Sequence, residues 1–210
     1  MGGDVITHAV QGLISAVTPV SISSLSKDIV LLIREDHDRV RSLYEQYKMP
    51  GTTAMQKRQL AWNIIREVSL HSAKEEEVVY PALRDVLGDL TPDHLLAEHQ
   101  ELKELLSLLD SSDVSDPNFD GRLQDIMEVL LHHMHEEEDD LLPRFAAAEG
   151  VSSDYLMQLG RLWETSKLHL PSRPHPWAPN KPPLNIVANA AAMPLDFLRD
   201  LVRFEGAPPL

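Results

Sequence analysis

Histidine, glutamate and proline recur in this chain at one fixed separation. Four pairs are each 62 positions apart: His37 with His99, His71 with His133, Glu75 with Glu137, and Pro81 with Pro143. A repeat at one offset indicates an internal duplication. Imidazole nitrogen and carboxylate oxygen are ligands that transition metals accept together. The sequence therefore predicts two metal-binding half-sites, one in each copy.

The spacing within each copy predicts how a half-site is built. The second His and the Glu are four residues apart, which places both side chains on one helix face. The two His of a copy are 34 residues apart, with a turn-forming segment midway (49–52 in the first copy, 111–116 in the second). In an antiparallel hairpin, residues equally distant from the turn lie level. Two hairpins would thus bring four His and two Glu together as a dinuclear site. Iron suits such a set, and zinc and manganese are also compatible with it.

Apolar residues at helical spacing predict the elements that hold these positions. Four helices are expected over residues 26–48, 53–87, 91–109 and 117–142. Ser24 or Ser26 is the expected N-cap of the first, Pro81 should kink the second, and Pro143 should end the fourth. Short connections between long helices are typical of an antiparallel bundle. The expected class is all-α, with an up-down-up-down four-helix bundle over residues 26–148.

Two flanking segments complete the expected organisation. Residues 1–25 form a variable leader, for which a short helix over 6–17 is one option. Residues 149–210 are expected to pack on the bundle as a fifth helix capped by Ser152 or Ser153, a Pro-rich extended segment, and a short amphipathic helix after Pro194. No segment has the pattern of a strand.

Composition narrows the compartment and the partners. The net charge of −14 argues against nucleic acid and against an anionic membrane surface, because both need a basic face. The absence of cysteine excludes disulfides, thiolate metal sites and iron–sulfur clusters. No run reaches about 18 apolar residues, and Asp4 stands where a signal peptide carries positive charge. A cytoplasmic monomer or homodimer is the default expectation.

Other His and acidic residues have simpler interpretations. His8, His169 and His175 are expected at the surface or in structural roles, and the repeat selects His99 over its neighbour His94. His132 and His135 are alternative or supporting ligands beside His133. Glu76 and Glu77 are expected to be exposed, although either could support a ligand. The run 136–140 is expected to form a solvated helix face except at Glu137.

At these residues the chain resembles the hemerythrin-like, or HHE cation-binding, family. The matching pieces are Asp36-His37, His71-Ser72-Ala73-Lys74-Glu75 with Pro81, Glu98-His99, and His133-Met134-His135-Glu136-Glu137 with Pro143. The resemblance covers about residues 26–148 and implies an antiparallel four-helix bundle around a non-heme di-iron centre, oxo- or hydroxo-bridged. It implies six iron ligands, of which both Glu are bridging candidates: His37, His71, Glu75, His99, His133 and Glu137.

The chain departs from the oxygen-carrying hemerythrins of invertebrates, which use five His, one Glu and one Asp. Their third helix has a second His one turn after the first, and that position here is Lys103. Their fourth helix has HxxxxD, whereas His133 here is followed by Glu137. Harder oxygen ligands favour ferric iron, so sensing, iron handling or redox chemistry is expected rather than simple O₂ carriage. Lys103 is a candidate to approach the centre and contact a bound oxygen species.

Three functions are compatible with these residues. The leading prediction is a di-iron protein that binds or reacts with O₂, peroxide or NO. The first alternative is an O₂-dependent oxidase or oxygenase acting on a small organic substrate, in a cavity roofed by Trp163 or Trp177. The second is an iron-responsive interaction module that folds when metal binds. The sequence leaves open whether the protein is an enzyme.

Overall fold

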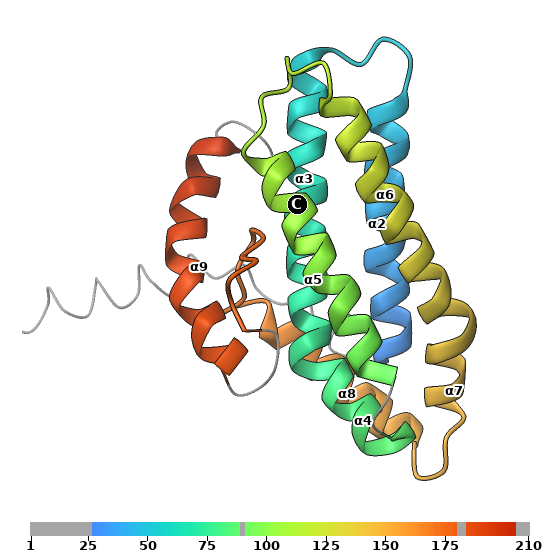
Figure 1. Cartoon of the computed structure of the whole chain (residues 1–210). Coiled ribbons are helices and arrows are strands. Elements are labelled where there is room, and N and C mark those ends of the chain that lie inside the picture. The colour runs from blue at the N-terminus through green and yellow to red at the C-terminus, as the bar shows by residue number, and fades with distance from the viewer. Residues whose placement is uncertain (1–26, 89–90, 180–183, 205–210) are drawn as a thin grey trace, which may run out of the picture.

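Four long helices lie side by side and alternate in direction in a computed structural model that describes residues 27–88, 91–179 and 184–204 (Figure 1). They are α2 (Ile29–Lys48), α3 (Ala54–Lys74), α5 (Thr91–Asp110) and α6 (Phe119–Glu136). The described residues contain no strand. The predicted all-α class and bundle are therefore confirmed. The leader helix considered over 6–17 lies outside the described residues.

Local hydrogen bonds fix where the helices begin. Asp28 caps α2, and its carboxylate accepts from the Leu31 N–H at 2.9 Å. The predicted caps Ser24 and Ser26 lie outside the described residues. At the start of α3, Thr53 and Gln56 form a reciprocal capping box.

The fourth helix begins later in the chain than predicted, at Phe119 instead of directly after Asp116. Asp116 instead accepts a hydrogen bond from the Asn118 N–H at 2.9 Å, and α6 begins at Phe119. An aspartate that bonds the backbone two residues ahead forms a turn and competes with helix. The helix therefore starts only after this turn is complete.

Both prolines of the repeat follow a π-helical turn. These turns are Glu75–Val79, followed by α4 (Tyr80–Leu87), and Glu137–Leu141, followed by α7 (Leu142–Ala146). Proline lacks an N–H and clashes with the carbonyl four residues earlier, and a wider turn relieves both problems. At Pro81, where a kink is predicted, the helix has a π turn directly before the proline. The helix end predicted at Pro143 is wrong, because the helix continues to Ala146. Each π turn begins at a Glu of the repeat.

The repeat residues form a polar layer between two apolar clusters of the bundle core. One cluster includes Val40, Ile65, Leu106 and Leu130, and the other includes Ile33, with residues of the π turns and of α8. Along α2, His37 lies between Ile33 and Val40, so the layer is closed off by apolar side chains on both sides. This position removes the layer from bulk water.

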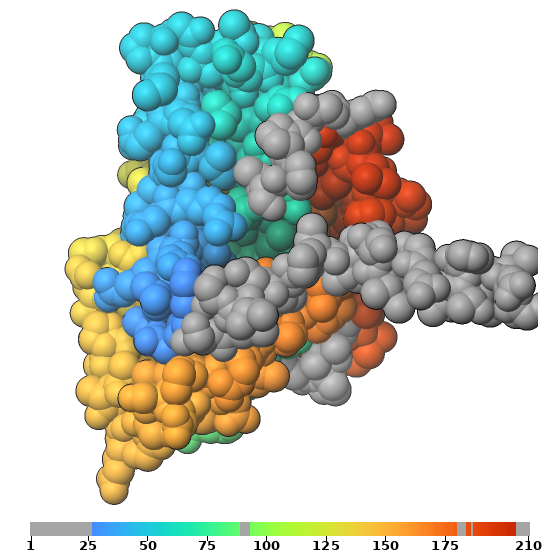
Figure 2. Space-filling model, turned by 180° about the vertical axis from the view of Figure 1, so that it is seen from behind, coloured from blue at the N-terminus to red at the C-terminus, as the bar shows by residue number. Residues whose placement is uncertain are grey.

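Helix α8 (Ser153–Ser166) covers one end of the bundle, with Ser152 as its N-cap. It packs against α2, as Figure 2 shows for the α8 segment (orange) beside the first turns of α2 (dark blue). A Cβ at Gly160 would lie 2.2 Å from the Lys27 carbonyl oxygen, so only glycine permits this approach. The contact places the Trp163 indole, which is fully buried, against the polar layer.

The C-terminal helix is longer than the sequence indicates. It is α9 (Leu184–Arg203), with Pro194 inside it, so the start predicted after Pro194 is wrong. The alanine-rich run 188–192 has high helix propensity and extends the helix on the N-terminal side of Pro194. Figure 1 shows α9 (red) beside α3 and α5, and Arg203 Nη1 donates to Asp110 Oδ1 at 2.5 Å.

Two further features complete the fold. None of the helices in the described parts of the chain combines the length and apolarity needed to cross a membrane.

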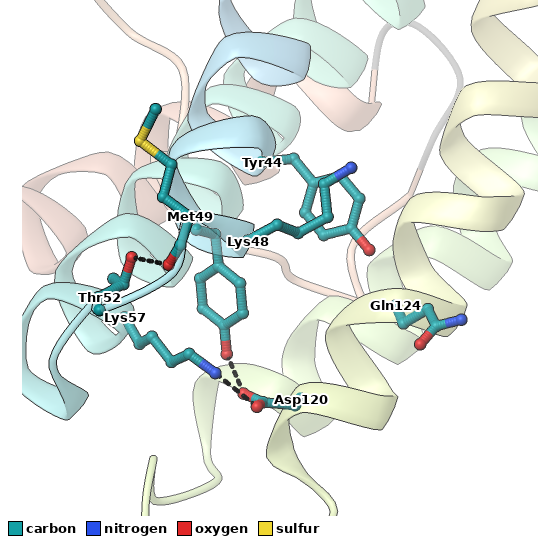
Figure 3. A pocket seen from close by; sticks show the side chains of 9 residues that line it. Tyr44, Lys48, Met49, Thr52, Lys57, Asp120 and Gln124 are labelled. Carbon is teal, nitrogen blue, oxygen red and sulfur yellow. Dashed lines mark hydrogen bonds and ion pairs between the residues drawn. The ribbon is translucent and has the colours of Figure 1, made fainter.

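A pocket of about 410 Å³ opens where α2, α3 and α6 meet. There the Tyr47 hydroxyl and the Lys57 ammonium both donate to the Asp120 carboxylate, each at 2.5 Å (Figure 3). None of the six predicted ligands lines this pocket.

Candidate metal centre

The structure brings all six predicted ligands together in the bundle interior, and each is at most 3% exposed. They form two facing imidazole pairs. His37 Nε2 lies 3.0 Å from His71 Nε2, and His99 Nε2 lies 3.2 Å from His133 Nε2. Each pair joins the two helices of one hairpin, as the spacing within each copy predicts.

The two glutamates lie between the imidazole pairs. Glu75 places Oε1 3.2 Å from His71 Nε2 and Oε2 3.3 Å from His99 Nε2. Glu137 places its two oxygens 3.5 Å from the Nε2 atoms of His37 and His133. Each carboxylate therefore faces one histidine of each pair. This is the arrangement expected of residues that share two metal ions.

A carboxylate faces the outer nitrogen of every histidine in the layer. Three Nδ1 atoms lie 2.7–3.2 Å from a carboxylate oxygen, and His71 Nδ1 lies 3.6 Å from Asp36. The three pairs are His37 with Glu138, His99 with Glu76, and His133 with Glu98. A carboxylate can only accept, so the Nδ1 atoms carry the hydrogens and the Nε2 lone pairs point inward. Metal-binding histidines commonly have such partners.

Cations hold most of these outer carboxylates in place. Lys74 pairs with Asp36, Lys103 lies 2.7 Å from Glu76, and Arg41 lies 2.9 Å from Glu138. Of this outer set the sequence indicated only Lys103, with Glu76 or Glu77 as an option for supporting a ligand, but the same 62-residue offset relates most of its members. The related pairs are Asp36 with Glu98, Glu76 with Glu138, and Arg41 with Lys103.

The donor set fits a cation at the centre. Inward lone pairs on two facing imidazoles repel one another unless a proton or a metal lies between them. Neither oxygen of Glu75, nor Oε2 of Glu137, has a hydrogen-bond partner, although all three atoms are buried. Buried carboxylates without partners are costly. The chemistry of the layer therefore calls for positive charge at the points where ligand atoms converge.

In the metal-free chain, protons supply part of this charge. Burial opposes protonation of His71, but Glu75 and Asp36 outweigh it and raise the pKa of His71 to about 10. Burial likewise opposes protonation of His99, yet Glu75 and Glu76 raise its pKa to about 9. One imidazole of each pair thus holds an extra proton at neutral pH. A metal ion must displace that proton, so metal binding should release protons.

This exchange predicts opposite pH behaviour for the two forms of the protein. The pKa values of His71 and His99 are raised above the value of about 6.5 for an unfolded histidine. Their stabilisation is complete below that pH and is lost as the pH rises through 9 to 10. We expect the melting temperature of metal-free protein to fall over this range, and that of metal-loaded protein to change less. Parallel melting curves for the two forms would contradict the prediction.

Comparison with known proteins agrees with this geometry. The family model for the hemerythrin HHE cation binding domain matches residues 28–145. The chain belongs to the hemerythrin HHE cation-binding family. An uncharacterized hemerythrin-like protein of Schizosaccharomyces pombe is 33% identical over 176 residues, which cover 81% of this chain and 84% of that protein.

Two more distant similarities were found. A DNA nickase of Nostoc sp. is 24% identical over 165 residues, which cover 79% of this chain but only 46% of the nickase. The crystal structure of a hemerythrin HHE cation binding domain-containing protein from Mycobacterium kansasii has a TM-score of 0.55 and 22% identity, and the match covers 68% of this chain and 86% of that one. At 22% identity, the match to the Mycobacterium kansasii structure supports the fold alone.

Within this HHE domain, several expectations about exposure need correction. Glu76 is 2% exposed rather than solvated, because it lies between His99 and Lys103. Glu138, expected on a solvated face, is half-buried against His37. The helical spacing places these side chains near the surface, and only contacts from neighbouring helices cover them. Glu77 is also partly covered, through His169.

Lys103, the position that differs from oxygen carriers, contacts Glu76 and not one of the six ligands. Tyr80 was not predicted for the site. Its hydroxyl lies 2.8 Å from His99 Nε2 and 3.3 Å from Glu137 Oε1. Burial and the nearby glutamates raise the pKa of Tyr80, so the hydroxyl stays protonated. The residue 62 positions later is Leu142, so the two halves of the centre differ here.

The outer carboxylates predict a measurable loss of affinity. In Glu138→Gln the pairing of His37 Nδ1 with a charged carboxylate is lost, so the imidazole becomes a weaker ligand. We expect metal affinity to fall about 10- to 100-fold. Asp139→Asn is the matched control, because Asp139 is exposed and pairs only with the exposed His135 among the described residues. Equal affinities in equilibrium dialysis would argue against a role for Glu138.

Proposed function

We propose that this chain is a non-heme di-iron protein that binds or reacts with O₂, peroxide or NO. One observation carries the proposal: two pairs of facing imidazoles lie in the bundle interior, and Glu75 and Glu137 each face one histidine of each pair. Four neutral imidazoles and two carboxylates form a mixed set that suits iron, with zinc and manganese as possible substitutes. Two iron ions, when bound, supply redox chemistry and open coordination positions for a small ligand.

The residues around the ligands have roles of their own in this proposal. The outer carboxylates orient the imidazoles and strengthen them as donors. Trp163 lies 5.4 Å from the His71 ring and, with the apolar clusters, limits contact with water. Of the two tryptophans considered for a roof, only Trp163 has this position, since Trp177 is 98% exposed. The carboxylate-rich set supports redox chemistry or sensing rather than reversible O₂ carriage.

The nickase activity of the Nostoc relative is not extended to this chain. The chain spans less than half of that protein, and a net charge of −14 repels the phosphate backbone of nucleic acid. The small ligands named above remain the proposed partners.

Metal analysis with optical spectroscopy tests the proposal. After anaerobic loading with ferrous iron, we expect about two irons per chain and, on exposure to O₂, peroxide or NO, new near-ultraviolet charge-transfer bands. Retention of zinc in place of iron, or two irons with no spectral response to any of the three ligands, would overturn it. Turnover of an added organic substrate would instead favour an oxygenase.

Tyr80 provides a more specific prediction for the same proposal. Its hydroxyl is a neutral donor beside His99 and Glu137, so it can donate to an oxygen or nitrogen atom of a bound ligand. In Tyr80→Phe we expect an unchanged metal content but weaker azide or NO binding, by about tenfold, for the loss of one hydrogen bond. Spectroscopic titration of the loaded protein measures this change. A loss of metal together with the hydroxyl would show that Tyr80 is a ligand instead.

A further inference from the structure

A second group of histidine and glutamate side chains lies on the outside of the bundle, between α5 and α6. His94 and Glu98 are one turn apart on α5, and His132 and Glu136 are one turn apart on α6. His94 Nε2 lies 3.2 Å from Glu98 Oε1 and 3.7 Å from Glu136 Oε2. His132 Nε2 lies 3.7 Å from Glu136 Oε1. Two antiparallel helices thus each present an HxxxE pair to the same place.

The separations between His94, Glu98 and Glu136 are compatible with one shared ion. Atoms bound tetrahedrally at about 2.1 Å from a metal lie about 3.4 Å from one another. Donor atoms of His94, Glu98 and Glu136 all lie within 4.8 Å of one another. His132 is outside this group of three, and its Nε2 lies 3.7 Å from the other oxygen of Glu136. The set combines imidazole and carboxylate, as the interior set does, and differs from a simple acidic cluster.

His132 and Glu136 form an HxxxE pair that the interior site does not use. The segment 132–137 contains two overlapping HxxxE pairs, one residue out of step. His133 and Glu137 point into the bundle and are buried, while the His132 side chain is 68% exposed and Glu136 is 42% exposed. A helical step of one residue rotates the side chains by about 100°, which separates an inner pair from an outer pair.

We propose that His94, Glu98 and Glu136 form a surface site for one divalent transition-metal ion, such as Zn²⁺, Mn²⁺ or Fe²⁺, and that His132 supports it through Glu136. Glu98 links this site to the interior centre. Its Oε1 faces His94, while its Oε2 lies 2.7 Å from the Nδ1 of His133. An ion at the surface would therefore lie one carboxylate away from a ligand of the interior centre. The link rests on the proposed role of His133, whereas the surface site itself does not.

The neighbouring helix surface offers a matched control. His135 and Asp139 are also one turn apart and exposed, with His135 Nδ1 3.0 Å from Asp139 Oδ2. They belong to none of the groups of three or more metal-binding side chains found among the described residues. An isolated pair of this kind should bind a metal ion only weakly, since it supplies two donors.

The test is a calorimetric titration with Zn²⁺ of full-length protein whose tightly held interior metal has first been counted. We expect one additional ion per chain in wild type. His94→Ala and Glu136→Gln should each weaken this binding at least about tenfold, and His135→Ala should leave it unchanged. The replaced side chains are 42–71% exposed and none is among the six candidate interior ligands, so circular dichroism and the interior metal count should match wild type.

Two outcomes would overturn the proposal. One is the absence of a saturable additional ion in wild type, and the other is equal binding by wild type and His94→Ala. Zinc is the only metal added, so either result leaves the di-iron proposal untouched. Conversely, a failure to load iron inside the bundle would not remove the dependence of the surface ion on His94.

Discussion

Glu75→Gln protein should lose the metal held in the bundle interior. Its metal affinity should fall by more than about 100-fold, the largest loss expected for removing an outer partner of a metal site. The reason is that Glu75 faces both imidazole pairs, 3.2 Å from His71 Nε2 and 3.3 Å from His99 Nε2. Glutamine keeps the shape of the side chain but removes the charge and one acceptor oxygen. The metal content of purified, reloaded protein measures the effect.

The matched control for this substitution lies two residues away. Glu77 is on the same π turn, but its carboxylate pairs with His169 at 2.9 Å and contributes to no metal-binding group among the described residues. Glu77→Gln should retain the metal content of wild type. If Glu75→Gln kept the metal content of wild type, Glu75 would not be needed to hold metal despite its position between the imidazole pairs.

Trp163→Ala should be the most destabilising single substitution outside the ligand set, at about 3–5 kcal/mol in the free energy of unfolding. The indole is fully buried in the apolar cluster that includes Ile33 and Phe145. Its ring also stacks under the Lys74 ammonium, 4.1 Å from the ring centre, and meets His71 edge-on. The substitution leaves a cavity and exposes the Lys74–Asp36 ion pair to water.

Trp177 provides the control for this prediction, because it is 98% exposed in the same C-terminal part of the chain. Trp177→Ala should change stability by no more than about 0.5 kcal/mol. Urea unfolding of both variants, each with its metal content measured, separates the loss of packing from the loss of metal. A similar loss in both variants would show that burial of Trp163 is not the cause.

Much of the bundle could be predicted because its pattern is local and repeated. The hairpin geometry needs only the helix period and the position of the turns, and these brought His37 level with His71 and His99 level with His133. The places where the helix bounds differ from the prediction also have local causes, but these causes leave weaker signals in the sequence than the helix period does. Asp116 delays α6 by forming a turn, and alanines before Pro194 extend α9 through a residue that usually starts or breaks a helix.

The outer shell of the centre could not be predicted from helical spacing alone. Glu76 and Glu138 follow the helix period as surface residues, and both are covered only because helices from the other hairpin pass over them. Tyr80 belongs to one half of the repeat and not to the other, so no symmetry argument could select it. Such contacts depend on which helices are neighbours and on how closely they approach.

The sequence by itself determined the six candidate ligands, since residue type, the 62-residue offset and the four-residue step restrict these side chains to one level of a helical bundle. The tertiary structure alone decided what surrounds them. It placed a carboxylate against each imidazole and packed the Trp163 indole against the layer. Helix periodicity is a property of neighbouring residues in the chain, whereas burial and the charge around a site arise from packing between segments far apart in it.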